Sequence, residues 1–388
     1  MNRFIIYVLT LGVFLTATSE LVVSGVLNVI AQDLRVSIAL AGQLITVYSL
    51  AYAIGTPIVI SMTYRMGRKK LLAGALTLFI AGCLVSAVSA DFTMLMAARV
   101  ILGLSAGVFL VVSFSSVAKI VAPEKIGSAI GTVILGFSAS LILGIPFGIA
   151  IANWLNWQAI FIILAILSLI ILFAVIRLLP EIEGDAPIPF KQQLLVLTNP
   201  IILAGLFITF FREAGNSIMY TYLTPFLANI MHLHSAEIGL TMLIFGIAGV
   251  VGSRFGGFAV DKWGTSRMII ISFTVPVASL ALLPVVTASL LAGIGLLTVW
   301  ICSTFVSAPA LQTYFIQQAP QSSSLVLSLN TSVIHLGLAA GAGLGGAVIN
   351  STSTVLYNPW AASIAIALGL VAAAASFSFR KSKQTVPA

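Results

Sequence analysis

The stretch PEIEGDAPIPFKQQ, residues 180–193, divides a chain that otherwise consists of long apolar runs. It carries three acidic residues and three prolines and lies almost at the midpoint of the 388 residues. Six apolar runs precede it and six follow it, each at least as long as the ~20 residues that a membrane-spanning helix needs. The stretch therefore predicts a polar loop over 181–198 between six-helix bundles at 1–180 and 199–388, with a short interfacial helix at 190–198.

The apolar runs make up most of the chain. We place the predicted spans at 4–30, 39–63, 70–90, 92–117, 126–150, 158–179, 199–230, 236–260, 266–287, 289–315, 323–349 and 356–379. Hydrophobic residues make up 60% of the sequence and charged residues only 7%, against about 25% charged in a soluble domain. The sequence predicts an all-α membrane protein with twelve transmembrane helices.

The basic residues predict how these helices are oriented. With the amino terminus inside, the 18 lysines and arginines all fall in inner segments, except Arg35 in an outer loop and Arg99, Arg212 and Arg254 within helices. The positive-inside rule then places both termini in the cytoplasm. Topology accounts for the net charge of +8, and because the basic residues form no stripe, we expect no nucleic-acid partner.

Two inner turns resemble each other, one at 64–70 (YRMGRKK) and one at 257–264 (GFAVDKWG). Both resemble the loop signature of the major facilitator superfamily, a Gly followed by Asp-Arg/Lys-x-Gly-Arg-Lys. Tyr64 stands where that signature has its Asp, so the gating ion pair of the Asp is not expected there. The resemblance implies gating roles for Arg65, Gly67, Arg68, Asp261, Lys262 and Gly264.

The fourth and fifth spans resemble the twelve-helix drug:proton antiporter branch of that superfamily. The fourth follows its Arg-x-x-Gln-Gly pattern from Arg99, with Leu102 in place of the Gln. The fifth has a variant of its glycine- and proline-rich motif, which implies gating roles for Gly144, Pro146 and Gly148. Sequences near Glu20 and Asn330 are most similar to purine base/nucleoside efflux and sugar efflux exporters. The resemblance implies the major facilitator fold and proton-driven export by alternating access.

Glu20 is a carboxylate deep within the first apolar run. An acidic side chain at the centre of a spanning helix costs roughly 2.5–3.5 kcal/mol, so Glu20 is expected to face protein or a water-filled cavity. At about 1.5 Å per residue, Arg99 lies at a similar depth. In the superfamily the first and fourth helices line one cavity, which would let the two residues face each other. We hypothesise that Glu20 carries the proton with Arg99 as its partner; the alternative is a fixed ion pair that joins the two helices.

The seventh span carries a second charged pair, Arg212 and Glu213. Neighbouring residues point about 100° apart on a helix, which predicts that these two do not pair with each other. Glu213, Asn216 and Tyr220 are predicted to share one polar face. Glu213 is a second candidate for proton coupling, and Arg212, Asn216 and Tyr220 are candidates for substrate contact. The purine-efflux exporters often have a histidine where Asn216 stands and usually lack this charged pair. The alternative role of Arg212 and Glu213 is to join helices.

The remaining candidates for substrate contact are aromatic or amide side chains and one imidazole. Such groups suit a flat heterocycle through stacking and hydrogen bonding. For each of them, packing or an interhelical hydrogen bond is the alternative. They are Tyr48, Tyr52, Gln312, Asn330 and His335.

The sequence favours no enzyme, metal or cofactor chemistry. GAGLGG at 341–346 satisfies G-x-G-x-x-G, but it lies inside an apolar run with no preceding strand, and no G-x-x-x-x-G-K-[ST] loop occurs. The three histidines and two cysteines form no metal-ligand pattern. We predict a monomeric, proton-coupled exporter of purine-like or drug-like solutes in a bacterial cell membrane. Alternatives are a sugar exporter, an uptake symporter or facilitator, and a membrane sensor without transport.

Overall fold

A computed structural model describes residues 3–63, 65–122, 126–184, 197–319 and 323–384, and its regular structure is entirely helical. Twelve helical stretches within this part of the chain are long and apolar enough to cross a membrane. They are Phe4–Gly25, Ile38–Met62, Arg68–Ala87, Phe92–Ile120, Ala129–Trp154, Trp157–Leu178, Pro200–Asn229, Ser235–Trp263, Thr265–Val285, Leu290–Gln318, Val326–Thr352 and Asn358–Phe377. The prediction of a twelve-span all-α membrane protein is confirmed. Tyr64 and residues 190–196 of the expected interfacial helix lie outside the described residues.

The chain divides into two compact units. The first comprises Met1–Pro187 with His234–Leu243, and the second comprises Ile188–Leu233 with Ile244–Ala388. The bundle limits at 1–180 and 199–388, with a loop at 181–198, remain a prediction.

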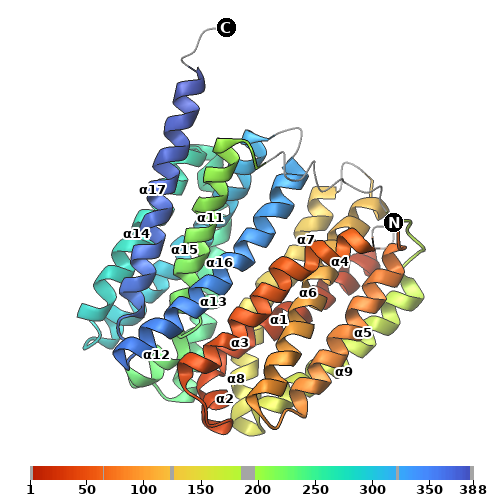
Figure 1. Cartoon of the computed structure of the whole chain (residues 1–388), viewed down its shortest axis with the longest axis horizontal. Helices are drawn as coiled ribbons and strands as arrows, with labels where there is room; N and C mark the ends of the chain where they lie inside the picture. Colours follow the sequence, from red (N-terminus) through yellow and green to blue (C-terminus); the bar gives the residue numbers. More distant parts are fainter. Residues whose placement is uncertain (1–2, 64, 123–125, 185–196, 320–322, 385–388) are drawn as a thin grey trace. The chain divides into compact units, whose positions relative to one another are not determined.

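The first unit is built around the central helices α1 and α6. Its helical segments are α1 (Arg3–Gly25), α2 (Leu27–Asp33), α3 (Ile38–Leu50), η1 (Ala51–Gly55), α4 (Thr56–Met62), α5 (Arg68–Ala87), α6 (Phe92–Ile120), α7 (Ile126–Ala139), η3 (Ser140–Gly144), α8 (Ile145–Trp154) and α9 (Trp157–Leu178). Helix α1 packs against α6, α7 and α8, and α5 lies between α6 and α9 (Figure 1). Ser37, Asp91 and Asn156 cap α3, α6 and α9 by accepting backbone N–H groups, which satisfies donors that a helix start leaves open.

Two spans of the first unit contain a five-residue π-helical turn, η1 in the second span and η3 in the fifth. Each turn is followed by a proline in the first turn of the next segment, Pro57 in α4 and Pro146 in α8. Proline has no N–H and disrupts the regular hydrogen-bond ladder, and π turns are common at such interruptions and at functional positions. Tyr52 lies in η1 and Gly144 in η3, so each widened turn holds one candidate residue.

The second unit is built around α11. Its helical segments are α11 (Pro200–Tyr220), α12 (Leu223–Asn229), α13 (Ser235–Trp263, whose first residues belong to the first unit), α14 (Thr265–Leu282), η4 (Leu283–Val285), α15 (Leu290–Gln318), α16 (Ser323–Thr352) and α17 (Asn358–Gln384). Helix α11 packs against α16 and α17, and α14 packs against α15 and α17 (Figure 1). The break between the ninth and tenth spans ends at Ser289, whose side chain caps α15.

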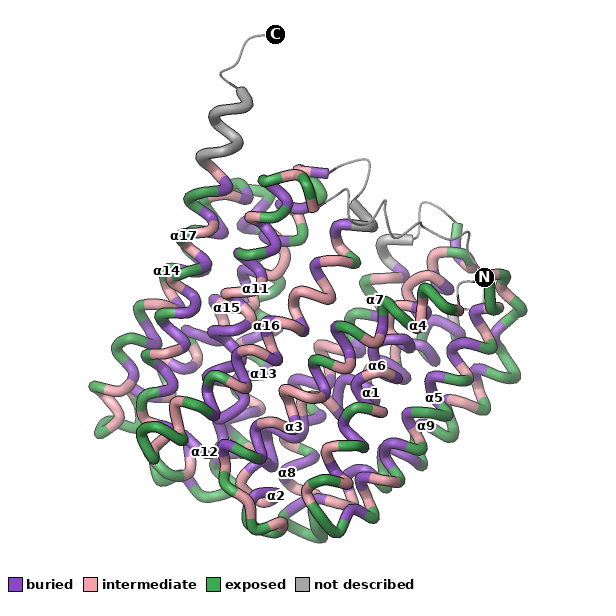
Figure 2. The backbone as a smooth tube through the Cα atoms, in the orientation of Figure 1, coloured by how far each residue is buried: buried purple, intermediate pink, exposed green. Residues whose placement is uncertain are grey.

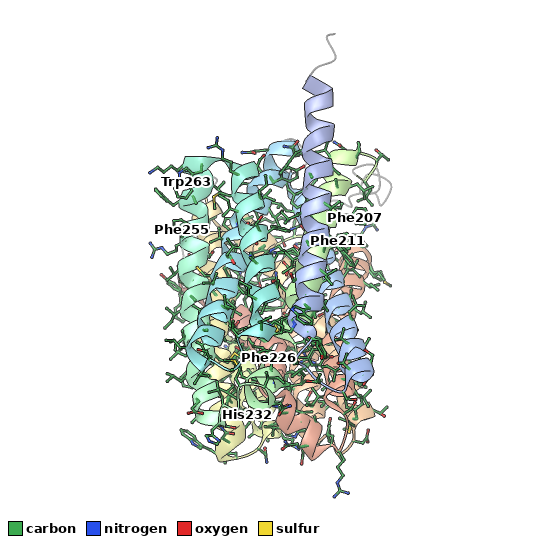
Figure 3. All side chains as sticks on the ribbon, turned by 90° about the vertical axis from the view of Figure 1, so that its left-hand side faces the viewer. Phe207, Phe211, Phe226, His232, Phe255 and Trp263 are labelled. Atoms are coloured by element: carbon green, nitrogen blue, oxygen red, sulfur yellow. The ribbon has the colours of Figure 1, made fainter. Side chains whose placement is uncertain are left out.

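Burial separates an interior from an apolar outer surface within each unit (Figure 2). Fully buried large side chains include Tyr48 and Arg99 in the first unit and Trp300 and Tyr222 in the second. Exposed apolar side chains cover the outward faces, as on α9, where Ile166, Ile170 and Phe173 are exposed. Aromatic residues also gather on the second unit, where Phe255 and Trp263 of α13 meet edge to face at 5.9 Å (Figure 3). Lipid tails solvate apolar side chains, so these faces suit a bilayer.

Candidate functional site

Arg99 lies fully buried in α6, and its guanidinium joins α6 to α1 and α3. Nη1 donates a hydrogen bond of 2.8 Å to the carbonyl oxygen of Ser19, and Nε donates one of 3.2 Å to that of Leu44. The central guanidinium carbon lies 4.3 Å from the centre of the Tyr48 ring, within cation–π distance. A buried cation is costly unless it is hydrogen-bonded and its charge is compensated, so these contacts hold Arg99 in a fixed position.

The close approach of α6 to α3 depends on Gly103, one turn after Arg99. A Cβ at this position would collide with the carbonyl oxygen of Tyr48. Because the two backbones nearly touch here, the Arg99 side chain reaches Leu44, one turn before Tyr48 on α3.

Glu20 is half-buried on α1 and directly follows Ser19. Its carboxylate interacts electrostatically with Tyr48, Tyr52 and Arg99. The Tyr48 and Tyr52 rings are 6.5 Å apart. The structure thus brings together four of the candidate residues, Glu20, Tyr48, Tyr52 and Arg99, which we call the first-unit cluster.

Several polar atoms in or beside the first-unit cluster are buried and have no hydrogen-bond partner among the described residues. They include Ser19 Oγ, Tyr48 Oη and Arg99 Nη2. Buried polar groups in proteins are normally satisfied by protein atoms or by ordered water. These atoms have almost no exposed surface, so only a buried water or a local rearrangement of the helices could give them partners.

Arg212 of α11 forms an ion pair with its sequence neighbour Glu213, so the prediction that the two do not pair is wrong. The angle between neighbouring residues fixes the directions of their Cβ atoms, but a long arginine side chain can bend back to its neighbour. Nε also donates to Ser307 Oγ at 2.6 Å, and Nη2 donates to the carbonyl oxygen of Thr304 at 3.0 Å. Arg212 therefore joins α11 to α15.

Asn216 also faces α15. Its Oδ1 accepts hydrogen bonds from Trp300 Nε1 and Thr304 Oγ1, both at 3.0 Å. The Tyr220 ring lies 6.4 Å from that of Trp300. The shared face of α11 is thus Arg212, Asn216 and Tyr220, at i, i+4 and i+8, rather than the predicted face that begins at Glu213. We call these three residues, with Glu213, Trp300, Thr304 and Ser307, the second-unit cluster.

The α15 members of the second-unit cluster were missed from the sequence. Trp300, Thr304 and Ser307 follow an i, i+4, i+7 spacing, which places them on one helix face. This polar stripe within an apolar span is the sequence signal that could have identified them. It precedes Gln312, the residue of this helix that the sequence analysis names.

The last three candidates have separate surroundings. Gln312 is exposed on α15. Asn330 and His335 are buried on α16, where Asn330 Oδ1 has no hydrogen-bond partner among the described residues. His335 Nδ1 lies 3.0 Å from the carbonyl oxygen of Thr331 in its own helix.

The first loop signature is held by the segment that follows α9. The backbone N–H of Arg68 donates to the carbonyl oxygen of Ile182 at 2.8 Å. Lys119 Nζ donates to the carbonyl oxygen of Glu183 at 2.9 Å, and Lys69 forms an ion pair of 3.7 Å with Glu181. Arg68 is buried, Gly67 caps α5, and Arg65 is exposed. Two gating candidates of this turn, Gly67 and Arg68, therefore lie against residues 181–182.

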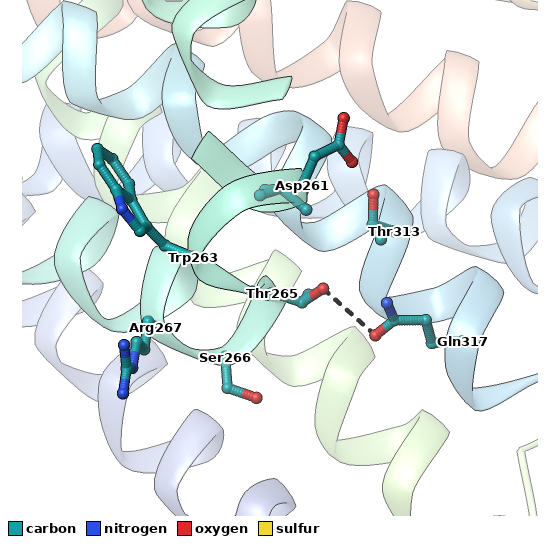
Figure 4. A pocket seen from close by; sticks show the side chains of 9 residues that line it. Asp261, Trp263, Thr265, Ser266, Arg267, Thr313 and Gln317 are labelled. Carbon is teal, nitrogen blue, oxygen red and sulfur yellow. Dashed lines mark hydrogen bonds between the residues drawn. The ribbon is translucent and has the colours of Figure 1, made fainter. Parts of the chain in front are cut away.

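The second loop signature ends α13 and borders a hollow of about 500 Å³ (Figure 4). Asp261 and Arg267 line the hollow, and Thr265 Oγ1 donates to Gln317 Oε1 at 3.3 Å. Gly264 has φ +83°, which a residue with a Cβ rarely adopts, so the tight turn into α14 requires glycine. Lys262 Nζ lies 5.7 Å from the centre of the Phe258 ring. No member of the second-unit cluster lines the hollow.

The glycines of the fifth span face α1. A Cβ at Gly144 would meet the Thr18 side chain, and one at Gly148 would collide with Val22. Pro146 lies in the first turn of α8. This motif therefore packs against the part of α1 that carries Glu20.

Twelve apolar helices in the described part of the chain, with buried Arg and Asn and half-buried Glu side chains, define a membrane protein of the secondary-transporter class. The sequence model of the Major Facilitator Superfamily matches residues 9–337 and 205–387. The chain belongs to this superfamily, whose members are transporters rather than enzymes.

Curated relatives match over nearly their whole length. The chain is 38% identical over 377 residues to the uncharacterized MFS-type transporter YbcL of Bacillus subtilis. This alignment covers 97% of this chain and 96% of the relative. It is 28% identical over 378 residues to the inner membrane transport protein YdhP of Escherichia coli strain K12, with 97% and 96% covered.

Solved structures show the same fold. The D-xylose-proton symporter has a TM-score of 0.81 at 17% identity, with 98% of both chains covered. A bacterial homolog of the human lysosomal transporter Spinster, in an inward-facing and occupied conformation, has a TM-score of 0.78 at 16% identity, with 98% of this chain and 97% of that chain covered. At these identities the likeness concerns the fold alone.

Proposed function

We propose that the protein exports small organic solutes in exchange for protons by alternating access, with purine bases or nucleosides as the first candidates and drug-like compounds next. The observation that carries this proposal is the first-unit cluster, in which the half-buried carboxylate of Glu20 interacts with the fully buried Arg99. Ionisable side chains inside spanning helices commonly mark proton or substrate paths. The Escherichia coli relative is named an inner membrane transport protein, which supports a place in a bacterial cell membrane.

Glu20 is the proposed proton carrier. Burial disfavours the charged form of a carboxylate, whereas a nearby guanidinium favours it. A change of hydration around Glu20 therefore shifts the balance between the two forms. Arg99 keeps its place throughout because main-chain carbonyl oxygens bind it. Glu213 is the second candidate, although its ion pair with Arg212 also suits a role in joining helices.

The proposed substrate contacts are aromatic and amide groups. Tyr48 and Tyr52 belong to the first-unit cluster, and Arg212, Asn216 and Tyr220 to the second. Aromatic rings stack on flat heterocycles, and amide and guanidinium groups bind their polar edges. Gln312, Asn330 and His335 remain proposed contacts on α15 and α16.

Proteoliposomes with imposed pH gradients test the mode of transport. An antiporter accumulates solute when the lumen is acidic, because protons that leave drive solute inward. A symporter accumulates the same solute only when the outside is acidic. We expect radiolabelled purine bases to accumulate with an acidic lumen, with protons moving outward at the same time. Accumulation under outside acid alone would show an uptake symporter, and ligand binding without flux would show a sensor.

Glutamine variants test the proton carrier. Glu20→Gln is expected to abolish gradient-driven accumulation while exchange of labelled for unlabelled solute continues, because exchange needs no net proton movement. Glu213→Gln is the parallel variant. If Glu20→Gln accumulated solute at the wild-type rate and Glu213→Gln did not, the carrier would be Glu213.

A further inference from the structure

The indole of Trp300 fixes which way the Asn216 amide faces. An indole N–H can only donate, and Trp300 Nε1 donates to Asn216 Oδ1 at 3.0 Å. Thr304 Oγ1 donates to the same oxygen at 3.0 Å. An amide oxygen has two lone pairs, so both are occupied. The two ends of the amide cannot be exchanged without placing an NH₂ group against the Trp300 N–H.

The other end of the amide, Nδ2, is what Asn216 can offer to a ligand. Nδ2 has no hydrogen-bond partner among the described residues, and it is not one of the partnerless side-chain atoms that are sealed within the protein. Asn216 as a whole keeps 7% of its surface exposed. A solute that reaches this side chain therefore meets a donor and no acceptor.

We propose that Trp300 is a positioning residue for substrate specificity, which holds Asn216 so that it selects flat solutes with a hydrogen-bond acceptor on the ring edge. This inference rests on the proposed function and adds to it the polarity of the atom recognised. The Tyr220 ring, 6.4 Å from that of Trp300, supplies an aromatic surface one turn after Asn216 on the same face of α11.

Thr304 cannot set this polarity by itself. A hydroxyl group donates or accepts equally well, so Thr304 Oγ1 would also accept a hydrogen bond from Nδ2 if the amide turned over. In Trp300→Phe the remaining partner tolerates both orientations, and Asn216 can then present either a donor or an acceptor. Trp300 is the partner that excludes the second orientation.

Adenine and its 1-deaza, 3-deaza and 7-deaza analogues are suitable probes, because each analogue replaces one ring nitrogen acceptor with C–H. KM and kcat for each are measured in proteoliposomes with an acidic lumen. For the wild type we expect at least one analogue to show a KM about 10-fold above that of adenine, since a site built for a hydrogen bond rejects a ligand that lacks it. In Trp300→Phe this ratio should fall below about 3-fold while kcat for adenine stays within about 2-fold.

Two further variants serve as controls. Thr304→Ser keeps a hydroxyl group and should keep the wild-type ratio. Trp154→Phe makes the same change at an exposed tryptophan of α8 and should also leave the ratio unchanged.

Asn216→Asp provides a second test if Trp300→Phe does not fold. A carboxylate only accepts, so it should raise the KM of adenine about 10-fold and remove the difference between adenine and the deaza analogue. Equal KM values across the deaza series in the wild type, or an unchanged ratio in Trp300→Phe or Asn216→Asp, would overturn this inference and leave the proposed function intact. Failure of all four compounds to accumulate would overturn the purine assignment and this inference with it.

Discussion

Arg99 Nη1 lies 2.8 Å from the carbonyl oxygen of Ser19, so the guanidinium is bound to the main chain directly before Glu20. A second carbonyl oxygen, that of Leu44, binds Nε. The position of Arg99 is thus set by backbone atoms of α1 and α3, whereas its charge acts on the carboxylate of Glu20. The contacts that hold Arg99 in place are therefore independent of the Glu20 side chain.

Arg99→Lys should lower the free energy of unfolding even though it keeps the charge. A guanidinium holds two donors at a fixed separation and lies flat on an aromatic ring, and a lysine ammonium does neither. The loss should be about 1–3 kcal/mol, the range for a hydrogen bond to a charged group that leaves a buried acceptor unpaired. Thermal unfolding in detergent measures it.

Arg177→Lys is the matched control for Arg99→Lys. Arg177 is exposed on α9, where its guanidinium lies 5.1 Å from the centre of the Phe173 ring. The Arg177→Lys variant should unfold at nearly the wild-type temperature. Equal shifts in the two variants would contradict a special role for the carbonyl contacts of Arg99.

Replacing one partner of the Arg212–Glu213 pair should lower the free energy of unfolding more than replacing both partners together. Their side chains are only 10% and 12% exposed, and breaking a buried pair typically costs about 3–5 kcal/mol because one charge is left unpaired. A cycle of Arg212→Met, Glu213→Gln and the double variant should give a coupling of about 1–3 kcal/mol. The more exposed pair of Lys69 and Glu181, with side chains 22% and 72% exposed, is the control, with an expected coupling below about 1 kcal/mol. Additive effects at Arg212 and Glu213 would show that the pair contributes nothing of its own.

The spans were predictable because each depends on a local property, the length of an apolar run. The interaction of Glu20 with Arg99 was also predictable. The helix rise per residue places both residues at a similar depth, and the family resemblance places the first and fourth helices along one cavity. Neither inference needs the orientation of an individual side chain.

The second-unit cluster depends on orientation and was only partly predictable. Arg212 and Glu213 were expected to lie apart because helix geometry fixes Cβ directions, but the length of the arginine side chain outweighs that angle. The partners Thr304 and Ser307 are short polar residues of a kind that occurs throughout apolar spans. Their pairing with α11 is a tertiary contact, and the sequence of α15 alone does not specify which helix its polar stripe faces.

Gly103→Ala should destabilise the contact between α6 and α3. The added methyl group would collide with the carbonyl oxygen of Tyr48, and overpacking of this kind costs about 1–3 kcal/mol. Gly74→Ala on α5 is the matched control, because nothing lies within 4 Å of a Cβ there. That variant should be neutral or more stable by up to ~1 kcal/mol, the helix preference of alanine over glycine. If both variants unfolded at the same temperature, the close approach at Gly103 would not limit the size of the residue.

Lys119→Met should weaken the contact between the first loop signature and residues 182–184, although Lys119 is not part of that signature. Lys119 Nζ donates to the carbonyl oxygens of Glu183 and Gly184, at 2.9 Å and 3.4 Å, and the neighbouring Ile182 accepts from the backbone N–H of Arg68. With the lysine contacts removed, this segment should detach more often and expose the Arg68 amide. Hydrogen exchange in a peptide that contains Arg68 should become about 2- to 5-fold faster, the equivalent of roughly 0.5–1 kcal/mol.

Lys70→Met removes a nearby exposed lysine and is the control for Lys119→Met. It should leave the exchange of the Arg68 peptide unchanged. Because both variants lose one positive charge, the comparison separates a general effect of charge from the loss of the Lys119 contacts. Faster exchange in both would indicate that net charge at this end of the unit, rather than the contacts of Lys119, holds residues 182–184 against the turn. Faster exchange in Lys119→Met alone would connect the loop signature to the segment after α9, so that a movement of that segment alters the turn in which the gating candidates Arg65, Gly67 and Arg68 lie.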